Sequence, residues 1–269
     1  VWRAIETASS DVVQEGAAGA GTGTTCFGWK GGIGTASRVA PEEAGGFTVG
    51  SLVQTNFGRP EQLTVAGVPI GRSLKPPADP GSEPTEGSSV MIVLATDAPL
   101  TSRQLHRLCV RTAAGLARTG SVFDHGSGDF VIAFTTAYRV DHAPRRLLTE
   151  RVTLAQEAQV LRGLFPAVVE SVEEAVLNSL WRAETVVGRD GHVRHGFTVV
   201  LKCFPERQHD PSPRCFGTSE GAEEIDRLSR HDARREPITL RVFVHDPTHD
   251  LGVRVDVGRR DVEGRPDDF

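Results

Sequence analysis

A loop rich in proline and glycine runs directly into a continuous apolar segment, and this junction is the strongest constraint that the sequence places on the fold. Residues 73–88 read SLKPPADPGSEPTEGS, whose four prolines and small polar residues predict an exposed, flexible loop. Residues 90–95 read VMIVLA, which is typical of a strand buried on both faces of a sheet. Ser88 and Ser89 therefore stand where a surface loop enters the centre of a layered domain.

A helix and a second strand are predicted after the junction. Residues 101–119 carry an apolar stripe at helical spacing, Thr101 or Ser102 can cap the start, and Gly120 ends the pattern. Residues 130–137 (FVIAFTTA) form another apolar run, which predicts a second buried strand.

Strands before the junction and a long helical region after it complete the pattern. Residues 45–56 and 62–71 contain β-branched residues bounded by Gly and Pro, which predicts strands. Residues 154–187 are strongly helical, and Pro166 is expected to kink this helix or to divide it in two. This order of elements predicts a layered α/β or α+β fold.

The last segment, residues 198–269, differs in composition from the rest. Its charged residues are more than twice as dense as those of residues 1–88. Within it, residues 238–245 (ITLRVFVH) and 251–258 (LGVRVDVG) alternate apolar and polar side chains. This alternation predicts a half-buried antiparallel β-hairpin in an atypical, charged tail.

Composition excludes several classes of function. The net charge of −5 argues against a nucleic-acid-binding role, and no apolar run approaches the roughly 20 residues that span a bilayer. The four cysteines form no CxxC pair and are expected to be reduced. Cys203, His209 and Cys215 match no common zinc spacing, so no zinc site is expected there.

Common catalytic motifs are also absent from the sequence. Residues 19–25 (GAGTGTT) lack the GK[ST] of a nucleotide-binding loop, and there is no HExxH or GxSxG pattern. Ser89 alone allows two interpretations. It is a turn residue at the start of a strand, or cleavage in front of it frees an α-amino group beside its own hydroxyl. An α-amine has a pKa near 7.7–8.0, so it could act as the base for that hydroxyl.

Several blocks along residues 1–197 resemble the DmpA/BapA family of aminopeptidases, which includes L-aminopeptidase/D-esterases and β-aminopeptidases. The matching blocks, in order, are Gly21–Arg38 (GTGTTCFGWKGGIGTASR), Leu52–Gly58 (LVQTNFG), Ser89–Leu100 (SVMIVLATDAPL), Gly115–Ser121 (GLARTGS), Gly126–Phe134 (GSGDFVIAF) and Ala183–His192 (AETVVGRDGH). The resemblance implies a four-layer αββα sandwich related to N-terminal-nucleophile hydrolases and to ornithine acetyltransferase.

The resemblance also assigns site residues. It implies self-cleavage between Ser88 and Ser89, which would give an α part (residues 1–88 here) and a β part whose core is residues 89–197. Ser89 matches the nucleophile, and Ser127 with Asp129 would orient its amine and hold the substrate. Asn56 matches the residue whose amide stabilises the oxyanion. Without the resemblance, Asn56 reads as a turn residue and Ser127 with Asp129 as a loop cap.

The implied activity is hydrolysis of small peptides, amino-acid amides or esters through an acyl-enzyme, without a metal or cofactor. Alternatives are an acyltransferase or a pantetheine-type amidohydrolase on the same scaffold, or a non-catalytic truncated remnant. Relatives with a threonine nucleophile form the acyltransferase branch, so Ser89 weighs against it. The resemblance further implies a homo-oligomer, often a tetramer of αβ units, to which residues 154–187 could contribute a surface. A cytoplasmic or periplasmic location is expected, with any signal sequence lying before Val1.

Two departures from the family pattern are expected to affect the site. Family members carry a long region before the block equivalent to residues 1–16, and this region supplies core strands and an active-site tyrosine. Tyr138, the only tyrosine here, does not match that residue. We therefore expect an incomplete sheet and an open pocket. Family members also end soon after the block at 183–192, whereas this chain continues to residue 269.

Overall fold

A computed structural model describes residues 2–77, 89–145, 147–197, 239–245 and 252–258. The helices are α1 (Trp2–Glu6), α2 (Ser102–Arg118) and α3 (Glu157–Trp181), with short 3₁₀ turns η1 (Gly19–Gly23), η2 (Glu42–Ala44), η3 (Pro60–Gln62), η4 (Ile70–Arg72) and η5 (Arg189–Gly191). The strands are β1 (Thr25–Cys26), β2 (Trp29–Lys30), β3 (Ile33–Val39), β4 (Thr48–Asn56), β5 (Ser89–Thr96), β6 (Gly128–Thr135), β7 (Val186–Val187), β8 (Val193–Arg194), β9 (Thr239–His245) and β10 (Gly252–Gly258).

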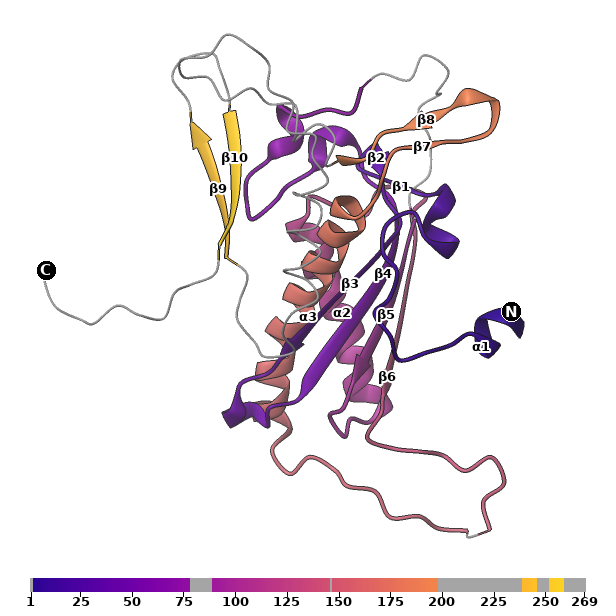
Figure 1. The fold of residues 1–269 in the computed structure, drawn as a ribbon. Coiled ribbons are helices and arrows are strands. Elements are labelled where there is room, and N and C mark those ends of the chain that lie inside the picture. Colours follow the sequence, from indigo (N-terminus) through magenta and orange to yellow (C-terminus); the bar gives the residue numbers. More distant parts are fainter. Residues whose placement is uncertain (1, 78–88, 146, 198–238, 246–251, 259–269) are drawn as a thin grey trace, which may run out of the picture.

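The central element is a four-stranded sheet in the order β3-β4-β5-β6 (Figure 1). β4 runs antiparallel to both β3 and β5, whereas β5 and β6 are parallel and are joined through α2. The parallel pair needs this crossover because parallel strands cannot be joined by a tight turn. The predicted segment 90–95 is thus confirmed as the centre of the sheet.

Helices α2 and α3 pack together and cover one face of this sheet (Figure 1). Alternate residues of β4 and β5 point toward them and are buried, among them Val53, Ile92 and Leu94. Gly34 lets the helix approach closely, because a Cβ at this position would lie 1.9 Å from the carbonyl oxygen of Ala175 on α3. The result is a mixed α/β fold whose core lies between the sheet and the two helices.

The start of α2 confirms its predicted cap. Thr101 accepts a hydrogen bond from the Gln104 amide, and the Gln104 side chain accepts one from the Thr101 amide, forming a capping box. After the helix, Gly120 adopts a positive φ of 100°, as expected for a residue that ends a helix.

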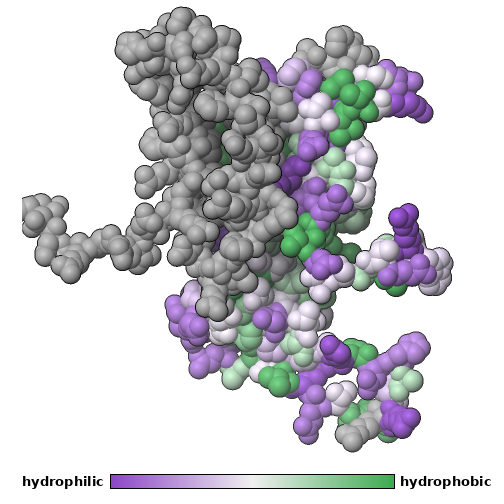
Figure 2. Space-filling model, viewed as in Figure 1, coloured by the Kyte–Doolittle hydropathy of each residue, from purple (hydrophilic) through white to green (hydrophobic). Residues whose placement is uncertain are grey.

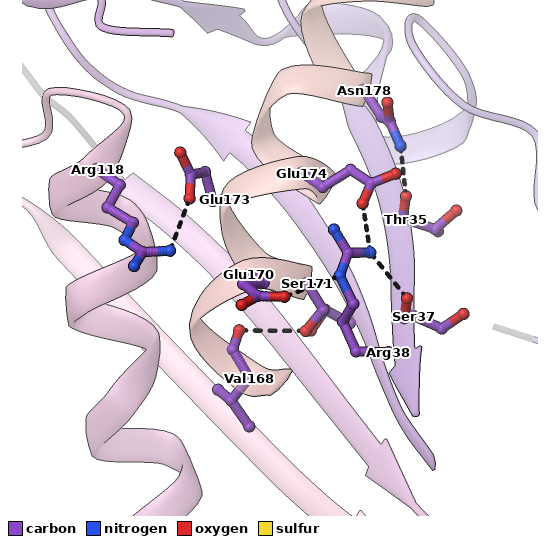
Figure 3. Close-up of polar contacts among 11 residues, drawn as sticks. Thr35, Ser37, Arg38, Arg118, Val168, Glu170, Ser171, Glu173, Glu174 and Asn178 are labelled. Atoms are coloured by element: carbon purple, nitrogen blue, oxygen red, sulfur yellow. Dashed lines mark hydrogen bonds and ion pairs between the residues drawn. The ribbon is translucent and has the colours of Figure 1, made fainter. Parts of the chain in front are cut away.

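Polar contacts hold α3 against the sheet and against α2 (Figure 3). Arg38 on β3 forms ion pairs with Glu170 (3.2 Å) and Glu174 (2.5 Å) of α3. The Asn178 amide donates to the Thr35 carbonyl oxygen at 2.8 Å. These contacts are partly exposed, so each ion pair contributes less than about 1 kcal/mol, and their main effect is to fix the position of the helix.

The other face of the sheet is largely uncovered by the described residues. Phe130, Ile132 and Phe134 of β6 point to this face and are 61, 60 and 46% exposed, and Met91 of β5 is 42% exposed. The predictions that residues 90–95 are buried on both faces and that residues 130–137 form a buried strand are therefore wrong for the described residues. Figure 2 shows hydrophobic residues at several places on the described surface, interspersed with hydrophilic ones. Of the four expected layers, the described residues contain the four-stranded sheet and the helical layer that covers one of its faces.

Two further expectations need correction. Residues 62–71 do not form a strand, because Pro60 and Pro69 flank a tight turn in which Val65 and Val68 exchange backbone hydrogen bonds. Ala66 and Gly67 occupy this turn with positive φ angles.

Pro166 does not divide the long helix, since α3 is continuous, but α3 ends at Trp181 and residues 186–187 form a strand. The predicted C-terminal hairpin is confirmed, because β9 and β10 pair antiparallel from Gly252–His245 to Gly258–Thr239.

Candidate active site

Ser89 is the first residue of β5 and lies between two other candidate segments. It pairs with Asn56, the last residue of β4, and with Gly128, the first residue of β6. Side chains alternate along β5, and Val90 points into the helix-covered core. Ser89 and Asn56 therefore point to the uncovered face, at one end of the sheet.

The loop before β6 brings Ser127 and Asp129 beside this position. The Ser127 hydroxyl donates to the Asp129 carboxylate at 2.6 Å. The Ser127 amide donates to the Asp124 carbonyl oxygen at 3.0 Å, and Gly126 takes a positive φ of 82° within this turn. Gly128 leaves space for the nucleophile candidate, because a Cβ there would lie 3.4 Å from the Ser89 hydroxyl oxygen.

The side chain of Asn56 is oriented by the β1-β2 hairpin. The Thr25 amide donates to Asn56 Oδ1 at 3.2 Å, so the Nδ2 group of the same amide points away from Thr25. The hairpin is joined to the end of β4 by a hydrogen bond from the Phe27 amide to the Phe57 carbonyl oxygen at 2.8 Å. Asn56 is exposed and can present its Nδ2 donor to a ligand.

A buried lysine, Lys30, ends β2 of this hairpin, and no role was predicted for it from the sequence. Lys30 is 1% exposed, and its Nζ donates to the carbonyl oxygens of Gly21 (2.8 Å), Thr24 (2.7 Å) and Gly31 (2.6 Å). Burial lowers the pKa of Lys30 to about 8. The only sequence signal was the position of this lysine within a glycine-rich block. Glycines let the backbone bend closely around a side chain, so that carbonyl oxygens can solvate a buried cation.

The remaining candidates lie apart from this site or outside the described residues. Tyr138 follows the far end of β6, and its hydroxyl donates to the Val152 carbonyl oxygen, so it is not brought to Ser89. Ser88, Cys203, His209 and Cys215 lie outside the described residues. Cys26 and Cys109 are free thiols. Within the described ranges no helix is long and apolar enough to cross a bilayer, and no His, Cys, Asp and Glu residues cluster as a metal site.

Comparison with known proteins agrees with this arrangement. A profile described as peptidase family S58 matches residues 1–194. Beta-peptidyl aminopeptidase BapA of Sphingosinicella microcystinivorans is 40% identical over 203 residues, which cover 71% of this chain and 50% of that protein. BapA of Sphingosinicella xenopeptidilytica is 36% identical, with 77% and 55% covered.

Solved structures share the fold. The PH0078 protein of Pyrococcus horikoshii OT3 is similar with a TM-score of 0.65 and 48% identity, covering 73% of this chain and 52% of that one. The L-aminopeptidase D-Ala-esterase/amidase of Ochrobactrum anthropi, described as a variant of the Ntn hydrolase fold, gives 0.63 and 38%, with 72% and 53% covered.

The sheet, its helical layer and the serine at the start of its central strand therefore place this chain in the class of Ntn-hydrolase-like folds. The chain belongs to peptidase family S58. It spans about half the length of the curated relatives it matches.

Proposed function

We propose that this chain carries the nucleophile of a serine aminopeptidase that releases N-terminal residues from peptides, amides or esters. The observation that supports this most strongly is the pairing of Ser89 with both Asn56 and Gly128, which gathers a hydroxyl and an amide donor at one end of the sheet. The similar proteins are described as a beta-peptidyl aminopeptidase and as an L-aminopeptidase D-Ala-esterase/amidase, which is the same kind of reaction.

In the proposed reaction, the Ser89 hydroxyl oxygen attacks the substrate carbonyl carbon and its proton passes to the free α-amine of the same residue. The oxyanion that forms accepts a hydrogen bond from Asn56 Nδ2. A fixed donor of this kind is worth about 10²–10³ in kcat in hydrolases of this type. The C–N or C–O bond then breaks, the protonated amine returns its proton to the leaving group, and water hydrolyses the ester on Ser89.

Ser127 and Asp129 complete the proposed site. Their hydrogen bond of 2.6 Å holds a hydroxyl and a carboxylate next to the start of β5. A carboxylate placed there would attract both the α-ammonium of the nucleophile and the ammonium of a substrate with a free amino terminus. Such a carboxylate would favour substrates that carry a free amino terminus.

The free amine requires cleavage between Ser88 and Ser89. In this step the Ser89 hydroxyl attacks the Ser88 carbonyl, the peptide C–N bond breaks to give an ester, and water releases the carboxylate of Ser88. Residues 1–197 would then form the hydrolase unit as two pieces, divided before Ser89, with 198–269 as a separate tail. We also propose a homo-oligomer. Its contact surface is not the apolar stripe of α3, because these side chains are buried within the chain itself.

The test measures turnover of three substrates, the p-nitroanilides of L-alanine, D-alanine and β-homoalanine, by the protein expressed from its full reading frame. Ser89→Ala should abolish turnover. Ser37→Ala, which removes an exposed hydroxyl from β3 in the same sheet, should leave it unchanged and serves as the matched control. Equal rates for the wild type and Ser89→Ala would refute the proposal. Transfer of the acyl group to an added amine in preference to water would favour the acyltransferase alternative.

A further inference from the structure

Lys30 is the only charged side chain that is fully buried among the described residues. Its ammonium group donates three hydrogen bonds, all to backbone carbonyl oxygens, and the described ion pairs include no carboxylate partner for it. Burying a charge without a counter-ion is costly, so the side chain is retained against a cost in stability. A buried charge of this kind often serves a functional site rather than stability.

Few titratable groups of the described residues lie near the Lys30 ammonium group. The adjacent turn η1 carries no titratable residue, and β1 contributes the Cys26 thiol, whose pKa is raised to about 12 by burial. The backbone amide of Lys30 donates a hydrogen bond to the His195 carbonyl oxygen at 2.8 Å. The facing end of β4, at Thr55 and Asn56, has no ionisable side chain. Below pH 8 the ammonium is therefore a cation whose hydrogen-bond partners, among the residues that the structure describes, are neutral backbone dipoles.

One peptide unit connects this ammonium to the candidate oxyanion donor. Its carbonyl oxygen belongs to Thr24 and accepts from Lys30 Nζ at 2.7 Å. Its amide belongs to Thr25 and donates to Asn56 Oδ1 at 3.2 Å. Because a peptide unit is planar, fixing its carbonyl fixes its N–H direction as well. The lysine and the asparagine thus bind opposite ends of the same rigid group.

We propose that Lys30 is a positioning residue that holds and polarises the Thr24–Thr25 peptide so that Asn56 presents its Nδ2 group to the oxyanion. This rests on the proposed function, in which Asn56 is the oxyanion donor. A cation on the carbonyl strengthens the peptide N–H as a donor, and that bond in turn strengthens the Nδ2 donor of Asn56, since hydrogen bonds in a chain polarise one another. The buried charge therefore acts on the reaction without contacting the substrate.

The first test is a double-mutant cycle in the protein expressed from its full reading frame. Lys30→Met should lower kcat by about tenfold with KM changed less than about twofold, because an oxyanion donor acts mainly in the transition state. Adding Lys30→Met to Asn56→Ala should lower kcat no further than Asn56→Ala alone. Lys75→Met, which alters an exposed lysine, is the matched control and should leave kcat unchanged. Multiplicative effects of the two substitutions would overturn the proposal.

The second test needs no substitution at Lys30 and no substrate. In the wild-type protein, the ¹³Cγ signal of Asn56 should titrate together with the ¹³Cε signal of Lys30, with a shared midpoint near pH 8. An Asn56 signal that stays constant through the Lys30 titration would overturn the positioning role. This measurement also separates the two proposals. If Asn56→Ala leaves kcat unchanged, the oxyanion role fails, and the co-titration still decides whether Lys30 orients the Asn56 amide.

Discussion

Asn56 and Ser89 are direct partners across the antiparallel strands β4 and β5, with Asn56 at the end of one strand and Ser89 at the start of the next. They are 33 positions apart in the sequence, and the loop that predicts the junction lies between them. Their pairing is a consequence of sheet register, because a shift of one residue would turn one of the two side chains toward the helices.

Removal of the Asn56 amide should lower the rate without unfolding the protein. Asn56→Ala is expected to reduce kcat about 10²–10³-fold, with a small change in KM, because the donor acts on the charge that develops in the transition state. Asn178→Ala is a matched control, since it removes another hydrogen-bonded asparagine, on α3. That variant should lose about 1 kcal/mol of stability and keep its kcat. Steady-state kinetics and denaturant unfolding measure both effects.

Self-cleavage should divide the protein in front of Ser89. We expect two bands on a denaturing gel, one of which gives the N-terminal sequence Ser-Val-Met-Ile-Val. Ser89→Ala should give a single band because the attacking hydroxyl is gone, whereas Ser88→Ala should still be cleaved. A new terminus that reads Ser-Ser-Val, together with a block by Ser88→Ala, would show that cleavage occurs one residue earlier.

Space at Gly128 should be needed for access to the nucleophile. A Cβ there would already contact the Ser89 hydroxyl oxygen at 3.4 Å, so the branched side chain of Gly128→Val would crowd it. We expect kcat/KM to fall about tenfold or more, since small displacements of reacting groups are costly. Gly128→Ala should show a smaller fall in kcat/KM. If the melting temperature of Gly128→Val fell so far that unfolding explained the lost activity, the proposed local crowding of Ser89 would be contradicted.

Two glycines in the sheet should respond oppositely to the same substitution. Gly34→Ala places a methyl 1.9 Å from the Ala175 carbonyl oxygen, so α3 must move away, at a cost of about 1–3 kcal/mol or more. Gly50→Ala on the uncovered face meets its first atom at 4.0 Å and should be neutral or slightly stabilising. Urea unfolding of both variants tests this difference, and equal losses would show that α3 is not in close contact at Gly34.

Stability above pH 9 should depend on Cys26. Burial raises the pKa of its thiol from 9.0 to about 12, so the folded state keeps this proton while the unfolded state releases it. The unfolded state then binds fewer protons, and stability falls as pH rises from 9 toward 12, by up to about 1.4 kcal/mol per pH unit. Relative to Cys26→Ala, the wild type should lose stability across pH 9–10.5 in guanidinium unfolding. Parallel pH profiles for the two proteins would contradict this.

The sequence predicted the elements that local chemistry determines. The β5 run, the Thr101 cap and Gly120 each carry a short-range signal, and the structure confirms them. Burial of β6 was predicted wrongly, because an apolar run does not show whether another layer covers its second face. Pro166 was expected to kink its helix or to divide it, and α3 continues through this residue without division.

The candidate site residues were proposed from the sequence, whereas the contacts that support them were not. Ser89, Asn56, Ser127 and Asp129 were identified through resemblance, and their roles remain predictions. The contact between Thr25 and Asn56 depends on how the β1-β2 hairpin folds against the end of β4, and the three carbonyls around Lys30 depend on how residues 21–31 fold around its side chain. No short-range pattern encodes such a contact, because its partners come from separate turns of the chain.

The position of the junction within the sheet has a consequence for a protein cut in front of Ser89. The cut would separate β3 and β4 from β5 and β6, yet β4 and β5 remain hydrogen-bonded along eight residue pairs, from Val49–Thr96 to Asn56–Ser89. Helix α3, from the second piece, packs on β3 and β4 of the first. The two polypeptides would share a single hydrophobic core, so separating them would unfold both. They would therefore be purified together and would lose activity together on unfolding.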